Sequence, residues 1–339
     1  MSLAPSISIT LGTLRYDTHT ARLTVCLAML PRGGSAEITL PAGVRFEAIP
    51  GDDAKIDVDG GEGSKTVLSG KVRSVRRTVD RIQVFAGDAG ADLGDYRPSS
   101  TFEGQDAASV IRKLASDVNA QTARVDVDLE LAAYCAHPSR TAAEHIAQLA
   151  FAGGAIAFTD ADGKLNVKAR PEGQATAALK FGREFTHYLA GPAKAVNPRR
   201  FAIGFGPAGS GGSPDALRPS VDILPDSAPD GGAGVRRIPS PFLRVPSAAT
   251  KASNAMQSAA AARTNTLIAH CFLLPALRPG DVVEVQELPD GLDAGPWLIT
   301  EVRHRYENGR GETRLTAEVA GAEGGSLLGA LAGAVGSLL

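Results

Sequence analysis

A short apolar strand runs into a glycine-rich loop near the middle of the chain. Residues 200–209 read RFAIGFGPAG and contain G-x-G-x-x-G, the spacing of a dinucleotide-binding loop. In such a loop the third glycine opens a helix whose N-terminal amides hold the pyrophosphate. Here Gly209 is followed by SGGSPDALRPS, in which Pro214 and Pro219 disfavour a helix, and no βαβ pattern flanks the segment. The glycines therefore indicate a strand that leaves its sheet, and we expect no bound cofactor.

Two other short motifs suggest chemistry but have the wrong spacing. Residues 160–163, DADG, begin like a calcium loop, but the fifth position is Lys164 and the twelfth is Pro171, where oxygen ligands are needed. We expect a hairpin turn there. Cys135-Ala136-His137 combines a thiol with an imidazole, but residues this close in sequence rarely converge as nucleophile and base. We expect Cys135 to be a small buried side chain.

The other histidines stand alone in the sequence, and none has a metal-binding spacing such as H-E-x-x-H: they are His19, His145, His187, His270 and His304. His304 falls in an alternating pattern, which predicts a packed or solvent-facing side chain on a strand. No G-x-S-x-G, no phosphate-binding-loop lysine and no paired carboxylates occur. We therefore expect no enzyme and no catalytic, cofactor-binding or metal-binding residue.

Composition indicates a folded protein with more than one core. The chain has 339 residues, of which 43% are hydrophobic and 21% charged. With 38 glycines, 21 prolines and only 5% aromatic residues, it favours short strands and turns over a helical bundle. A net charge of -2 gives no sign of nucleic-acid or anionic-membrane binding. Without a signal-peptide pattern or an apolar run long enough to span a bilayer, we expect Cys26, Cys135 and Cys271 to be free thiols.

The alternation of apolar and polar residues divides the chain. Residues 1–98 alternate with period two and predict a first β-barrel-like domain. Residues 99–198 mix helical and strand patterns, so we expect an α+β insertion domain. Asp106 is the expected N-cap of a helix over 107–119. A second helix over 142–152 is expected to end at the following glycine pair and to lead into a hairpin.

The β pattern returns in a second β-barrel-like domain, expected over residues 199–320. Within it, residues 207–246 are rich in Gly, Pro, Ser and Asp and predict a long loop. The alanine-rich stretch 248–267 predicts a helix. An apolar C-terminal tail covers residues 321–339. The expected fold class is therefore mainly β, with an α+β domain between two similar β domains.

Two stretches of the sequence resemble a known family. Residues 102–120, FEGQDAASVIRKLASDVNA, and residues 140–167, RTAAEHIAQLAFAGGAIAFTDADGKLNV, look like the central segment of phage baseplate hub proteins of the late control D family. The related N-terminal part of VgrG spikes is similar. A helix at 249–267 followed by residues 273–319, with LRPGD at 277–281, resembles the family's closing domain. The two stretches cover about half of the chain in the family's order.

The resemblance implies a structural role. It implies a homotrimer in which each chain contributes two similar β domains, so that three chains form a pseudo-sixfold ring. Such a ring joins a sixfold tail tube to a threefold spike around a central channel, in a phage tail or a phage-derived contractile injection particle. The implied partners are the tail tube, spike, tape-measure and baseplate wedge proteins. DNA passes through the channel without specific binding. The implied location is the baseplate of the virion tail, assembled in the host bacterial cytoplasm.

The C-terminal tail carries a separate hypothesis of partner contact. Apolar residues recur there at helical spacing, at Leu327, Leu328, Leu331, Val335 and Leu338. Three such tails could bundle in the lumen and touch the tape-measure or spike protein, whereas the alternative is a frayed terminus. For the whole chain, a tail-associated peptidoglycan hydrolase, a free-standing surface-binding β module and a type VI secretion spike component remain as alternatives.

Overall fold

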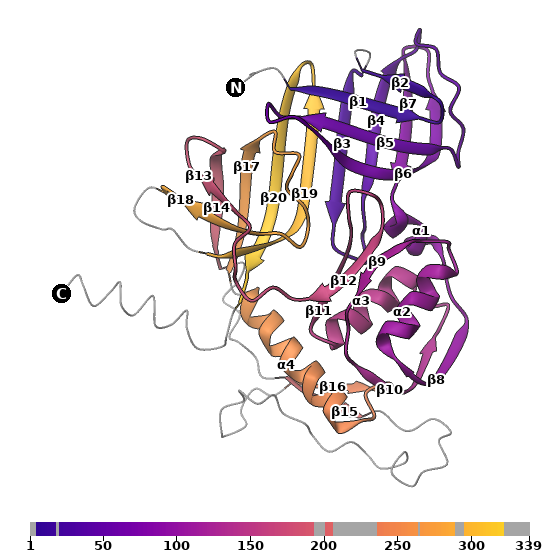
Figure 1. Ribbon diagram of the computed structural model, residues 1–339, viewed down its shortest axis with the longest axis vertical. Helices are drawn as coiled ribbons and strands as arrows, with labels where there is room; N and C mark the ends of the chain where they lie inside the picture. Colours follow the sequence, from indigo (N-terminus) through magenta and orange to yellow (C-terminus); the bar gives the residue numbers. More distant parts are fainter. Residues whose placement is uncertain are drawn as a thin grey trace, which may run out of the picture.

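The computed structural model describes residues 5–17, 20–192, 201–205, 236–263, 265–288 and 295–321. Within these ranges the chain forms twenty strands and four helices. Figure 1 shows two β modules side by side, with a smaller module of helices and short strands below them. The expectation of a mainly β fold with few helices is confirmed.

The first β module is antiparallel throughout. Its strands are β1 (Ser6–Leu11), β2 (Leu14–Tyr16), β3 (Arg22–Ala28), β4 (Ser35–Pro41), β5 (Asp53–Asp59), β6 (Ser64–Arg77) and β7 (Arg81–Gly87). They lie in the order β3-β4-β7-β6-β5-β1-β2. Alternate residues of β3, β4 and β7 are buried, as the period-two pattern predicts. The long strand β6 bends from one neighbour to the next, pairing with β5 through its first half and with β7 through its second.

The second β module continues the same sheet. Its strands are β13 (Ala177–Lys180), β14 (Phe185–Pro192), β17 (Asn265–Phe272), β18 (Val282–Gln286), β19 (Trp297–Glu307) and β20 (Arg310–Val319). The order is β14-β17-β20-β19, and β19 then pairs with β3 of the first module. The turn between β19 and β20 is Asn308-Gly309, both with positive φ, as a two-residue hairpin requires.

The mixed module holds the four helices. Its elements are α1 (Ala89–Asp95), β8 (Ser100–Asp106), α2 (Ala107–Ser116), β9 (Thr122–Val125), β10 (Glu130–Ala136), α3 (Ala142–Ala152), β11 (Ala155–Thr159), β12 (Leu165–Ala169), β15 (Phe201–Phe205), β16 (Arg236–Ser240) and α4 (Pro246–Ala262). Asp106 caps α2 by accepting from the backbone N–H of Ser109, as predicted. Thr141 and Glu144 form a capping box at the start of α3.

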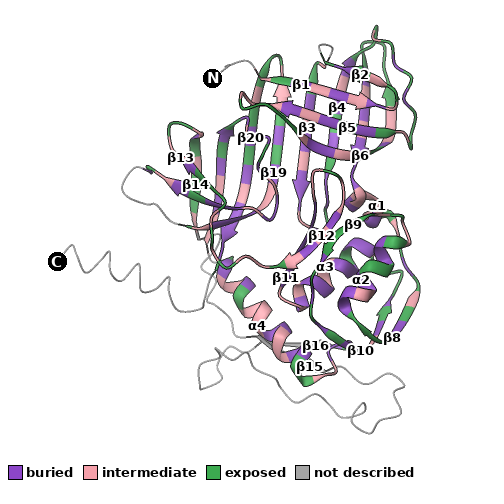
Figure 2. Ribbon diagram, viewed as in Figure 1, coloured by how far each residue is buried: buried purple, intermediate pink, exposed green. Residues whose placement is uncertain are grey.

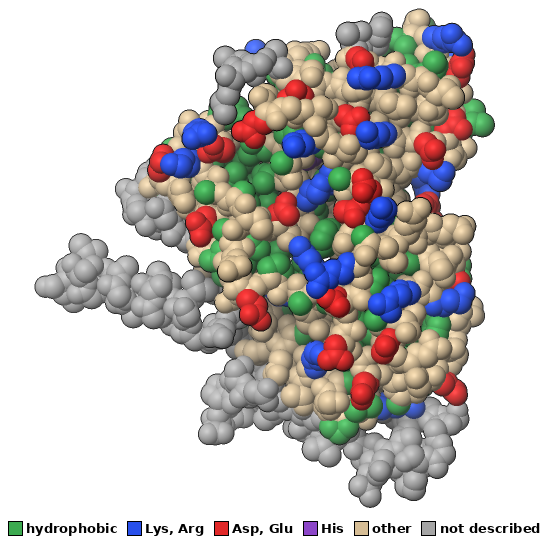
Figure 3. Space-filling model, in the orientation of Figure 1, with side chains coloured by type: hydrophobic (Ala, Val, Ile, Leu, Met, Phe, Trp, Pro, Cys, Tyr) green, Lys and Arg blue, Asp and Glu red, His purple; other side chains and the backbone are tan. Residues whose placement is uncertain are grey.

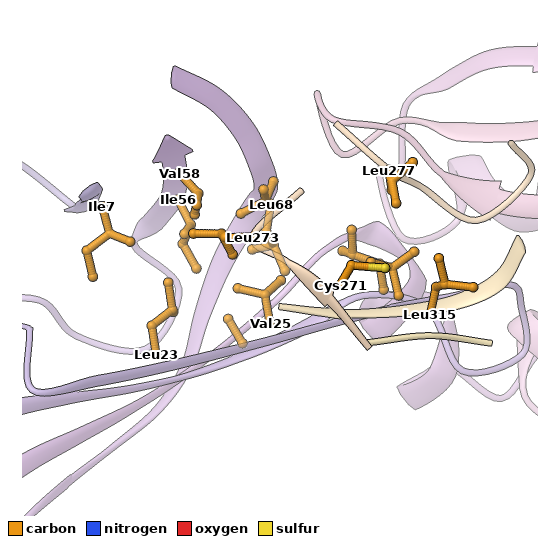
Figure 4. Packing of buried hydrophobic residues seen from close by; sticks show 14 of the residues in the cluster. Ile7, Leu23, Val25, Ile56, Val58, Leu68, Cys271, Leu273, Leu277 and Leu315 are labelled. Atoms are coloured by element: carbon orange, nitrogen blue, oxygen red, sulfur yellow. The ribbon is translucent and has the colours of Figure 1, made fainter. Parts of the chain in front are cut away.

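Two main cores hold these modules (Figure 2). One core is shared by both β modules and runs without a break from one to the other. In the close view of Figure 4, Leu273 of the second module lies beside Leu68 and Val25 of the first. The other core belongs to the mixed module, where α2, α3 and the first half of α4 bury alanine, leucine and isoleucine side chains. The β modules therefore form one folding unit, and the mixed module has its own core.

Several element boundaries differ from the sequence-based ones. Strands β13 and β14 fall within residues 99–198, yet they pair with β18 and β17 of the second β module. The helix expected over 248–267 ends at Ala262, and β17 begins at Asn265, where β-branched residues replace alanine. Of the loop expected over 207–246, residues 236–240 form β16. Residues 206–235 and the tail residues 322–339, including the five named above, lie outside the described residues.

Candidate functional site

Eight consecutive strands of the large sheet form a surface with one buried and one polar face. They run in the order β14-β17-β20-β19-β3-β4-β7-β6 and fall into two four-stranded halves joined where β19 pairs with β3. The inward residues, such as Leu23 and Val302, lie in the shared core. The outward residues of the central strands include Thr24, Glu37 and Arg303, all partly or fully exposed. Each half therefore presents a mostly polar outer surface.

Both ends of this eight-stranded run have backbone edges that are open. At one end, no described strand pairs with β14 beyond a single bridge between Phe181 and Phe185. At the other end, β5 pairs with β6 only as far as Lys71, so residues 73–77 have no described strand on that side. Unpaired strand edges are templates for pairing with another chain. Because the two edges differ, they could join head to tail, and such an interface closes into a ring or extends into a filament.

The LRPGD segment at 277–281 is the point where the three modules meet. The Arg278 guanidinium reaches across to the first β module and donates to the backbone carbonyls of Thr66 and Val67, the latter at 3.3 Å. The Asp281 carboxylate accepts from the Arg278 backbone N–H at 2.9 Å and closes the turn. Burial lowers the pKa of Arg278 and is opposed by nearby carboxylates, with Asp281 the strongest. A half-buried arginine thus connects two modules by donating to backbone carbonyls.

The same segment receives the β11–β12 hairpin of the mixed module. The Phe158 ring lies against Gly280, so closely that a Cβ there would come within 2.8 Å of it, and Gly280 has a φ of +91°. Lys168 donates to the Gly280 carbonyl at 3.2 Å and lies over the Phe158 ring. Ile156 and Phe158 also share a small core with Val282 and Leu298. Only glycine fits this backbone conformation and this contact.

Asp88 fixes the mixed module to the first β module. Its side chain is 3% exposed and accepts hydrogen bonds from the backbone N–H groups of Gly34 at 3.0 Å and Gly90 at 2.8 Å. The Thr159 hydroxyl on β11 donates to its other carboxylate oxygen. Burial raises the pKa of Asp88, whereas these hydrogen bonds oppose that shift. One carboxylate therefore connects the β3–β4 turn, the start of α1 and the β11–β12 hairpin.

His304 is a buried titratable group beside the shared core. Its side chain is 1% exposed and points inward from β19. The Thr313 hydroxyl accepts from the Leu274 N–H at 2.8 Å and forms a second hydrogen bond with His304 Nδ1 at 2.9 Å. The other ring nitrogen, Nε2, has no hydrogen-bond partner among the described residues. Burial, aided by the charge of Arg278, lowers the pKa of His304 to about 3.

The other residues singled out from the sequence do not come together. Residues 160–163 form the expected hairpin turn, in which the Asp160 carboxylate accepts from the Asp162 and Lys164 N–H groups. The prediction that Cys135 is buried is wrong, because it lies on the exposed side of β10. Cys271 is buried and Cys26 is half-buried, and all three are free thiols. Of the G-x-G-x-x-G segment, the structure describes only residues 201–205, which form β15.

Sequence reasoning missed the roles of Arg278, Asp88 and Thr159. Arg278 belongs to the LRPGD pattern, which the sequence analysis used only as part of the resemblance to the hub family. Nothing in the sequence indicates that Asp88 and Thr159 meet, since they are far apart along the chain. Within the described ranges, no cluster of three or more His, Cys, Asp or Glu side chains could hold a metal ion. None of the helices described is long and apolar enough to cross a membrane.

Comparison with known proteins gives likeness of fold without likeness of sequence. The sequence matches no protein-family model and no curated protein. The structure, however, is similar to a tail protein from Neisseria meningitidis MC58, with a TM-score of 0.70 and 15% identity over 93% of this chain and 96% of that one. The 43 kDa tail protein of prophage MuSo2 from Shewanella oneidensis gives a TM-score of 0.68 and 16% identity, over 93% and 98%.

The chain has the fold of phage tail proteins. A third neighbour is an E. coli component of the type VI secretion system that is described as similar to the T4 bacteriophage tail proteins gp27 and gp5. Its TM-score is 0.63 at 12% identity, over 93% of this chain and 77% of that one. The tail-protein fold agrees with the resemblance seen in the sequence.

Proposed function

We propose that the protein is the structural hub of a phage tail or of a related injection particle, located in the baseplate of the virion tail. It would join the sixfold tail tube to the threefold spike as a homotrimer around a central channel. The observation that carries this proposal is the eight-stranded run with two four-stranded halves and two different open edges. Three chains joined edge to edge would present six similar halves, and a trimer would retain threefold symmetry elsewhere.

The polar face of the run suits the wall of a channel. Its outward residues are mostly polar and charged, while the inward residues belong to the shared core. In the proposed ring, β14 of one chain pairs with residues 73–77 of the next, which removes both open edges. The tail tube, spike, tape-measure and wedge proteins are the proposed partners. Its neighbours of similar fold are tail proteins, which supports a structural rather than an enzymatic role.

A disulfide ladder tests the ring. In a chain whose three cysteines are replaced, Leu189→Cys on β14 is combined with Ser74→Cys on β6, since both side chains lie on the polar face near an open edge. Cross-strand neighbours are close enough for a disulfide. Oxidation should give covalent species that stop at three chains, and light scattering should give the mass of a trimer.

A second cysteine pair serves as the control for the disulfide ladder. Leu189→Cys combined with Thr24→Cys, which lies on the central strand β3, should give no ladder, because Thr24 is far from either open edge. A ladder that continues past three chains would mean an open filament rather than a ring. A monomer without cross-links at high concentration, alone and with a spike protein, would refute the hub proposal.

A further inference from the structure

Four basic or imidazole side chains form one row across the polar face of the second β module. His187, His270, Arg314 and Arg303 are successive register partners on β14, β17, β20 and β19. All four are exposed. Adjacent strands lie about 4.8 Å apart, so the row spans about 14 Å. Its two arginines place like charges side by side in a protein whose net charge is -2. The view in Figure 3, by contrast, shows acidic and basic side chains interspersed.

No carboxylate stands within the row itself, although Glu312 lies on the same face across from Phe272, 3.9 Å from Arg305. Arg314 makes no ion pair within the described part of the chain, and its neighbour across the strands is another arginine. The nearest acidic contact of Arg303 is Glu301 at 3.9 Å, and Glu301 already binds Arg32 at 2.8 Å. Like charges placed directly opposite on a sheet are destabilising. Such a pair is relieved when an anion binds between the two guanidinium groups.

Exposed aromatic rings adjoin the row. Phe272 is 56% exposed on β17, two residues beyond His270 on the same face. The rings of His270 and His187 are 5.7 Å apart. Sequence-independent binding sites for single-stranded nucleic acids have two components. Basic side chains contact the phosphates, and aromatic rings stack on the bases. An acidic peptide would use the arginines but would have no use for a bare aromatic face.

We propose that this row binds single-stranded nucleic acid without sequence preference. Arg303 and Arg314 contact backbone phosphates, and Phe272 stacks on a base. The inference rests on this face of a single chain and does not require the proposed ring of three chains, although that ring would bring three such rows together. It goes beyond the hub role, which requires no contact with nucleic acid.

The test is the salt dependence of binding to a fluorescent oligothymidine, followed by anisotropy on the full chain. Arg303→Gln/Arg314→Gln should weaken binding and reduce the slope of log K against log salt by about 1.4, or about 0.7 for each phosphate contact. Phe272→Ala should weaken binding roughly tenfold with an unchanged slope, because it removes stacking and not charge. The control Arg45→Gln/Arg81→Gln removes the same charge from exposed, ion-paired sites and should change the slope little.

Several outcomes would overturn the inference. One is no binding of the oligothymidine by the unaltered chain at 50 mM salt or below. Another is equal loss of affinity in the control and in the arginine variant, which would show only general charge attraction. Polyglutamate that competes as well as oligothymidine would identify an acidic protein segment as the ligand instead. The mass of each sample by light scattering separates these results from failure of the trimer, because binding is expected at any oligomeric state.

Discussion

Replacing His304 should make the protein more resistant to mild acid. In the folded chain the imidazole is buried, is hydrogen-bonded to the Thr313 hydroxyl and has a pKa lowered to about 3. In the unfolded chain a histidine titrates near pH 6.5. Between these values the unfolded state binds a proton that the folded state does not, so the free energy of unfolding falls as the pH falls. Its contribution to stability is complete above about pH 6.5 and is lost progressively on the way to pH 3.

The size of the effect follows from this difference. The slope is about 1.4 kcal/mol for each pH unit, which gives a loss of about 2 kcal/mol between pH 8 and pH 5 from this one group. His304→Asn keeps an acceptor near the position of Nδ1 but does not titrate. The variant should be less stable at pH 8, because it leaves unfilled volume, yet its stability should fall less steeply below pH 6.5.

Urea unfolding at half-unit steps from pH 4 to pH 8 measures the two slopes. The exposed His270→Asn serves as control and should change neither stability nor slope appreciably, since its side chain lies on the polar face. Nitrogen chemical shifts of the imidazole should show a neutral ring down to pH 5. Equal slopes for the native chain and His304→Asn between pH 4 and pH 6 would refute the reasoning.

Four further predictions concern the junction and the thiols. Asp88→Ala should cost about 2–3 kcal/mol in the free energy of unfolding, because it leaves buried N–H groups without acceptors. Asp88→Asn should cost much less, since its side-chain oxygen can accept from the backbone N–H groups and its amide can donate to the Thr159 hydroxyl. Arg278→Lys should lose one carbonyl contact and cost about 1–3 kcal/mol by thermal unfolding, with no change expected in the control Arg15→Lys on the exposed surface. Gly280→Ala should lower the melting temperature by several degrees, because a Cβ would strike the Phe158 ring, and a neutral result in calorimetry would show that the hairpin can move aside. In the native protein a thiol reagent should label Cys135 rapidly and Cys271 only on unfolding, as burial raises the pKa of Cys271 to about 12; rapid labelling of both would contradict this.

Local pattern predicted many of the elements well. The period-two alternation identified β3, β6 and β7. Asp106 marked the start of α2 because capping is a local interaction. Pairing between distant strands was beyond such reasoning. Nothing near β14 in the sequence shows that it pairs with β17, and the alanine-rich run before Asn265 gave no sign of where its helix ends.

The candidate site was harder to predict for the same reason. The outward residues of the eight-stranded run look like any solvent-facing strand residues until the register is known. The partners of Arg278 are backbone carbonyls, which carry no sequence signature at all. Cys135 was misplaced because its strand, β10, pairs only with β8, and this two-stranded sheet leaves one face open to solvent.

The pairing of β3 with β19 has a consequence for the order of events during synthesis. These strands lie near opposite ends of the chain, as the pair Leu27 and Val302 illustrates. At ribosomal speeds of about 5–20 residues per second, roughly 15–50 s pass between the emergence of one and of the other. During that interval the β3 edge of the newly made first module has no partner, and the same edge of a neighbouring nascent chain is equally free. Timing on the ribosome, or a chaperone that shields the edge, then decides whether each chain completes its own sheet.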